Sequence, residues 1–158
     1  MPSFHRFARC ARLQRLLHGA AVLAVVAAPV PAQSEGVRAQ TVASGLQNPW
    51  ALAFLPDGRF LVSERPGRLR VVLPGGQLQP PIDGLPEIAA GGQGGLLDVA
   101  TDADFARNRT LYFCFAEPGP GATNGTALAR ARLSADERRL EAVQVIFSQR
   151  PKVASTLH

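Results

Sequence analysis

The sequence predicts an all-β protein built from blades of a β-propeller, and three observations support this prediction. After residue 40, apolar residues occur in short runs that Pro, Gly, Asn and Asp separate, a pattern typical of strands joined by turns. Helical periodicity is weak, with one short candidate helix at residues 134–140. Leu52-x-Phe54-x-x-Asp57 and Leu97-x-Val99-x-x-Asp102 repeat at an interval of 45 residues, which matches the length of a propeller blade.

The first repeat contains three expected strands, at residues 50–55, 60–63 and 69–73. Pro56-Asp57-Gly58 and Pro66-Gly67 separate them, because proline fixes φ and glycine supplies the positive φ that many turns need.

The second repeat is expected to hold strands at residues 95–100, 110–115, 126–133 and 141–147, with turns at residues 102–108 and at Asn124-Gly125. Strand spacing alone also fits a β-sandwich. The 45-residue repeat is what favours propeller blades of four short strands.

Residues 33–158 hold fewer than three such repeats, whereas closed propellers have about four to eight blades. An unclosed stack leaves strand edges and an apolar blade face in water. We therefore expect the chain to be the amino-terminal part of a longer propeller. The alternative is a small β protein that assembles from several copies.

Residues 1–32 are predicted to be a signal peptide. A basic segment without acidic residues precedes an apolar run of 13 residues, and Pro29-Val30-Pro31-Ala32 resembles a cleavage site. A membrane-spanning helix needs about 20 apolar residues, so we expect export to the periplasm or medium and no stable membrane anchor. Without the leader, 13 basic and 12 acidic side chains remain, a net charge of +1 that argues against a nucleic-acid partner.

Gly91-Gly92-Gln93-Gly94-Gly95 is the most unusual segment, because four glycines surround one amide side chain. It lacks the Gly-Lys-Ser/Thr of a phosphate loop. A flexible turn is the simple interpretation, but the segment directly precedes an expected innermost strand, where propellers bind ligands. Gln93 is therefore a candidate binding residue.

Other polar residues carry less information. Asp98, Asp102 and Asp104 lack the spacing of a calcium loop and are expected to stabilise turns, so no metal site is predicted in this chain. The alternating charges of residues 130–141 indicate a solvated face. His158 alone, at the last position, indicates almost nothing.

Several motifs together resemble one family: Asn48-Pro49-Trp50-Ala51-Leu52-Ala53-Phe54, Ser63-Glu64-Arg65-x-Gly67-Arg68-Leu69, Gly92-Gln93-Gly94-Gly95-Leu96-Leu97-Asp98 and Asp104-Phe105. They are similar to the amino-terminal blades of the soluble quinoprotein sugar dehydrogenases (glucose/sorbosone and aldose), which use pyrroloquinoline quinone. The resemblance runs from about Val37 to His158. It implies a six-bladed β-propeller, oxidation of aldose sugars, and an external electron acceptor.

The resemblance also implies residue roles. His158, which follows Lys152-Val153, matches the general base that takes the proton of the anomeric hydroxyl, and Gln93 matches a glutamine of the substrate and cofactor pocket. Glucose-type members carry an aspartate where this chain has Leu157, which favours the broader aldose branch.

The family's basic quinone-binding residues and calcium ligands lie further along the chain, so we expect residues 1–158 alone to be inactive. The alternative function is a non-catalytic propeller that binds carbohydrate or protein partners.

Overall fold

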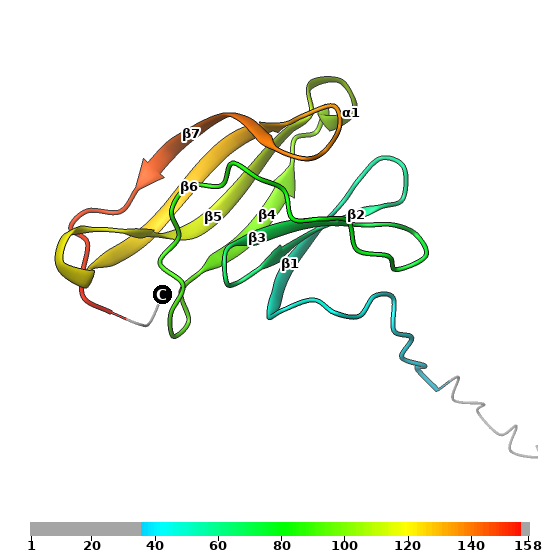
Figure 1. Cartoon of the computed structure of the whole chain (residues 1–158), viewed down its shortest axis with the longest axis horizontal. Helices are drawn as coiled ribbons and strands as arrows, with labels where there is room; N and C mark the ends of the chain where they lie inside the picture. The colour runs from blue at the N-terminus through cyan, green and yellow to red at the C-terminus, as the bar shows by residue number, and fades with distance from the viewer. Residues whose placement is uncertain (1–35, 156–158) are drawn as a thin grey trace, which may run out of the picture. The chain divides into compact units, whose positions relative to one another are not determined.

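The computed structural model describes residues 36–155 as an all-β fold of antiparallel sheets (Figure 1). The expected signal peptide at residues 1–32 lies outside the described residues. Residues 1–38 and 39–158 are separate units, and the sheets belong to the second. Within the described part of the chain, no helix has the length and apolar character needed to cross a membrane.

The first repeat forms a three-stranded sheet in the order β1-β2-β3, from β1 (Pro49–Phe54), β2 (Phe60–Glu64) and β3 (Arg68–Val72). The expected turns connect them. Leu55 N–H donates to Arg59 O at 2.9 Å across the first turn, where Gly58 has a φ of 80°. The predicted boundaries of these strands are therefore confirmed to within one or two residues.

The second repeat forms a four-stranded sheet in the order β4-β5-β6-β7. Its strands are β4 (Leu96–Thr101), β5 (Thr110–Pro118), β6 (Asn124–Leu133) and β7 (Leu140–Ser148). The short helix α1 (Phe105–Asn108) connects β4 to β5, and the 3-10 turn η1 (Pro120–Ala122) connects β5 to β6. The two repeats therefore differ in strand number.

Two local expectations were wrong. Asn124-Gly125 is not a turn but the beginning of β6, because the extended pairing of β5 continues to Pro118↔Asn124 and the chain reverses at η1. Residues 134–140 do not form a helix. Glu137 takes a positive φ of 60° there and Glu137 N–H donates to Ser134 O at 3.0 Å, so this segment is the turn between β6 and β7.

The core lies between the two sheets. Along β6 every second residue is buried, and three of these residues are alanines (Ala127, Ala129, Ala131). Small side chains leave room for larger ones, and the fully buried Leu61, Leu69, Leu111, Phe113 and Phe115 belong to the same cluster. Strands β1 and β2 pack against β4, so the first strands of the two repeats are neighbours.

The other face of the first sheet remains apolar and exposed. Trp50 and Leu52 are each 54% exposed and Phe54 is 70% exposed, and they line a groove of about 670 Å³. The edge strand β7 exposes Val145, Ile146 and Phe147. These surfaces agree with the expectation that an unclosed stack of sheets leaves apolar faces in water.

Candidate functional site

Gln93 lies in a tight glycine loop that precedes β4. Gly94 N–H donates to Gly91 O at 2.8 Å, and Gly92 takes a φ of 55°, in the left-handed region that favours glycine. The Gln93 side chain is exposed. The glycines therefore form a specific turn that presents one amide group to solvent.

Gly95, at the end of this loop, packs against the backbone of Arg65, the residue that follows β2. Its φ is 148°, and a Cβ at this position would lie 2.2 Å from Arg65 O. The missing side chain allows Leu96 N–H to donate to the same oxygen at 3.0 Å. The glycine is required here by the close approach of two backbone segments.

A buried serine aligns the first strands of the two sheets. Ser63 on β2 is fully buried, and its Oγ donates to Leu97 O on β4 at 2.5 Å. Ala51 N–H on β1 donates to Ser63 Oγ at 3.1 Å. One hydroxyl group therefore links three strands, which brings the beginnings of β1 and β4 to one edge.

We call this edge the Gln93 edge and define it by Asn48, Arg65 and residues 91–95. A cleft of about 210 Å³ lies here, lined by Asn48, Arg65, Pro66, Ala90, Gly91 and Gly94. In Figure 1 the loop before β4 lies at the end of the sheet remote from α1.

The segment after β7 returns to the same edge. Val153 and Asn124 exchange two backbone hydrogen bonds, of 2.9 and 3.0 Å, and Asn124 Nδ2 donates to Ser155 O at 2.8 Å. A pocket of about 560 Å³ is lined on one side by Ala154 and Ser155 and on another by residues 89–91. The last described residues therefore lie beside the loop that carries Gln93.

A lysine–glutamate pair holds this segment. Lys152 Nζ forms a short ion pair with Glu117 Oε2 and donates to Glu117 O at 3.2 Å, and Ser148 Oγ donates to the same carboxylate at 2.5 Å. The Lys152 side chain is only 6% exposed. The hydrogen bond from Lys152, with a second from Ser148, lowers the pKa of Glu117 below its usual value.

Of the two site residues inferred from sequence, the structure describes Gln93. His158 lies outside the described residues, and its role stays a prediction. Ser155, three positions before His158, is the last described residue. The anchoring by Asn124 and by the Lys152–Glu117 pair was missed from sequence, because no local motif indicates a pair 35 residues apart.

The described residues do not fit a calcium site, since none of them form a cluster of three or more metal-binding side chains. Asp102 accepts hydrogen bonds from Asp104 N–H at 2.9 Å and from Asn108 Nδ2 at 2.8 Å, and these bonds lower its pKa. The expectation that these aspartates stabilise a turn is therefore confirmed for Asp102.

The Gln93 edge carries hydrogen-bond donors that suit an anionic group such as a carboxylate. Gln93 offers an amide donor and acceptor, and Arg65 offers a guanidinium group. Arg65 Nε is buried and has no hydrogen-bond partner within the part of the chain that is described.

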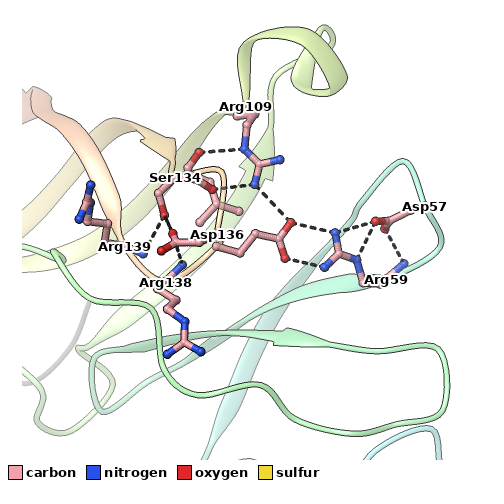
Figure 2. A network of polar contacts seen from close by, with 9 residues as sticks. Asp57, Arg59, Arg109, Ser134, Asp136, Arg138 and Arg139 are labelled. Carbon is pink, nitrogen blue, oxygen red and sulfur yellow. Dashed lines mark hydrogen bonds and ion pairs between the residues drawn. The ribbon is translucent and has the colours of Figure 1, made fainter.

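The opposite edge, where β1 and β4 end, carries a polar network that joins the two sheets (Figure 2). Glu137 accepts hydrogen bonds from Arg59 Nη1 and Nη2 at 2.5 and 2.8 Å, and from Arg109 Nη2 at 3.2 Å. The sequence prediction of a solvated face is therefore wrong for Glu137, which is 17% exposed and bridges the sheets.

The two antiparallel sheets, with their first strands adjacent and a glycine loop at a shared edge, define a propeller-type β protein. The family model described as glucose / sorbosone dehydrogenase matches residues 46–158, and the chain belongs to this family.

Individual relatives agree with this assignment. The chain is 39% identical over 123 residues to the aldose sugar dehydrogenase YliI of Escherichia coli K12, a match that covers 77% of this chain and 33% of that protein. A crystal structure of a glucose dehydrogenase matches with 50% identity and a TM-score of 0.70, over 72% of this chain and 33% of that one.

A further solved relative is the PQQ-bound aldose sugar dehydrogenase of Streptomyces coelicolor, with 30% identity and a TM-score of 0.59 over 70% of this chain and 33% of that chain. The chain thus spans about a third of the length of these relatives.

Proposed function

We propose that the chain is the amino-terminal part of an exported, six-bladed quinoprotein dehydrogenase that oxidises the anomeric hydroxyl of aldose sugars to lactones. Membership of the glucose/sorbosone dehydrogenase family supports the sugar dehydrogenase activity, and a PQQ-bound relative supports the cofactor. Export to the periplasm or medium rests on residues 1–32.

The observation that carries the proposal is the convergence of two segments at the Gln93 edge. The glycine loop ends beside Arg65, and the segment through Ser155 is anchored on Asn124 next to Gly91. A residue three positions beyond Ser155 is within about 11 Å of it, because an extended chain advances about 3.3–3.6 Å per residue.

In the proposed mechanism, His158 takes the proton of the anomeric hydroxyl while the hydrogen on the anomeric carbon leaves as hydride. An imidazole suits this role because its ordinary pKa lies near neutrality. The exposed Gln93 amide holds a neighbouring sugar hydroxyl, to which it can both donate and accept. Pyrroloquinoline quinone, when bound, would supply the hydride acceptor, with an external electron acceptor as the final oxidant.

The experiment is sugar oxidation by the full-length protein that carries this chain, with added quinone, calcium and a dye as acceptor. His158→Ala should lower kcat by about 100-fold or more, in the range of general-base catalysis. Gln93→Ala should mainly raise KM for the sugar, and Gln77→Ala, a change at an exposed glutamine after β3, should alter neither.

Near wild-type turnover by His158→Ala would show that the base is another group. Binding of aldoses without any oxidation, in the presence of quinone and calcium, would instead support a carbohydrate-binding propeller. The 158-residue chain by itself is expected to be inactive, because the family resemblance implies that the basic quinone-binding residues and the calcium ligands lie further along the chain.

A further inference from the structure

Arg65 differs from the other half-buried arginines of the described chain. Those arginines all have polar partners for their guanidinium groups: Arg59 with Asp57 and Glu137, Arg68 with Glu64, Arg70 with Gln79 O, and Arg109 with Glu137 and two carbonyl groups. The Arg65 guanidinium has no hydrogen bond or ion pair to any residue in the range 36–155, and its Nε is buried. A buried N–H of a charged group without an acceptor is costly.

The neighbouring acid does not compensate this charge. Glu64, directly before Arg65, is fully buried, but its carboxylate accepts a hydrogen bond from Arg68 Nε at 2.8 Å and a short one from Gln47 N–H. The six residues that line the cleft at Arg65 include no acidic side chain. The cleft is therefore a positively charged site without a counterion in the described structure.

The glycine loop adds further donors to the same edge. The backbone N–H groups of Gly91, Gly92 and Gln93 donate to no group within residues 36–155, and Gly91 lines the cleft. Successive free N–H groups next to a left-handed residue, here Gly92, are a common way to bind anions.

We propose that the cleft at the Gln93 edge binds a carboxylate group, with Arg65 as its charged donor. The planar guanidinium fork matches the two oxygens of a carboxylate. Two ligands of the proposed function could carry this group: the quinone, which has carboxylates, and an acidic sugar such as glucuronate. The choice of these ligands rests on the proposed function, whereas the charged cleft does not.

The test is titration of the full-length protein with pyrroloquinoline quinone, glucuronate and glucose, followed by calorimetry. Arg65→Gln should weaken binding of the carboxylate ligand by about tenfold or more, and Arg65→Lys should restore part of that loss. Arg138→Gln removes the same charge from an exposed arginine near the opposite edge, and should leave all affinities unchanged.

The pattern of losses identifies the source of the carboxylate. Weaker quinone binding assigns the site to the cofactor, and weaker glucuronate binding with unchanged glucose binding assigns it to an acidic sugar. Unchanged affinity for both carboxylate ligands in a folded Arg65→Gln protein would overturn the proposal.

A second measurement needs no variant at Arg65. In wild-type protein labelled with ¹⁵N at arginine, the Nε–H resonance of Arg65 should shift when the carboxylate ligand saturates its site, and no shift would overturn the proposal. The base assignment is tested separately, by the turnover of the His158→Ala protein. Failure of the base assignment and failure of the carboxylate site are therefore distinguishable.

Discussion

Lys152, whose side chain is 6% exposed, is ion-paired with Glu117 at the end of β5, and this contact fixes the segment that leads toward His158. Lys152→Met in the full-length protein should lower kcat about tenfold with little change in sugar KM, because small displacements of a catalytic group lower the rate strongly. Lys152→Arg should recover part of the rate. The measurement is steady-state kinetics together with a melting curve.

A matched control for this change is Arg132→Met, which breaks an ion pair with Glu141 on the same sheet. The Arg132 side chain is 60% exposed, whereas that of Lys152 is nearly buried. It should leave kcat unchanged. If Lys152→Met lowered the melting temperature while kcat per folded molecule stayed at the wild-type value, the lysine would have a structural role alone.

The lowered pKa of Glu117 predicts an acid-dependent contribution to stability. Because the folded-state pKa lies below the ordinary 4.5, the stabilisation is fully present above about pH 4.5 and is lost as the pH falls through the folded-state pKa. Glu117→Gln should therefore be less stable than wild type at pH 7, and the difference should shrink toward zero in acid. Urea unfolding between pH 7 and pH 2.5 measures this, and a difference independent of pH would contradict it.

Glu137 joins the two sheets through Arg59 and Arg109, so Glu137→Gln should lower the free energy of unfolding by about 1–3 kcal/mol. Glu141→Gln is the control, because its arginine partners are 60% and 66% exposed and such pairs contribute about 0–1 kcal/mol. Denaturant unfolding of both variants measures these free energies. Equal losses would contradict a stabilising role for the Glu137 bridge between the two sheets.

Gly95→Ala tests the close approach between the glycine loop and Arg65. The new Cβ would lie 2.2 Å from Arg65 O, so the loop must move, at a cost of about 1–3 kcal/mol or more. At Gly91 a Cβ would meet nothing within 4 Å, and Gly91→Ala should be nearly neutral. Thermal unfolding compares the two variants. Equal stability would contradict the claim that the close approach to Arg65 requires a glycine at position 95.

The strands were predictable from sequence because their apolar runs and turn residues are local signals. The 45-residue repeat correctly indicated that β1 and β4 are equivalent first strands. Local signals failed where pairing overrides propensity: Asn124-Gly125 suits a turn, yet nine residue pairs between β5 and β6 extend the strand through it.

The candidate site was predictable only in part. The glycine loop is visible in sequence, because so many glycines around one glutamine are unusual. The bonds that align it, from Ser63 to Leu97 and from Leu96 to Arg65, join residues about 30 positions apart and follow from the packing of the sheets. The Glu137 bridge was likewise missed, because its partner Arg59 is 78 residues away.

A crystal structure of the full-length protein with an aldose bound tests most directly whether Gln93 and His158 form one sugar-binding site. We predict that the Gln93 amide and the His158 imidazole both lie within hydrogen-bonding distance, about 3 Å, of hydroxyl groups on one sugar molecule. A sugar bound elsewhere, or a His158 side chain that points away from the Gln93 edge, would contradict it.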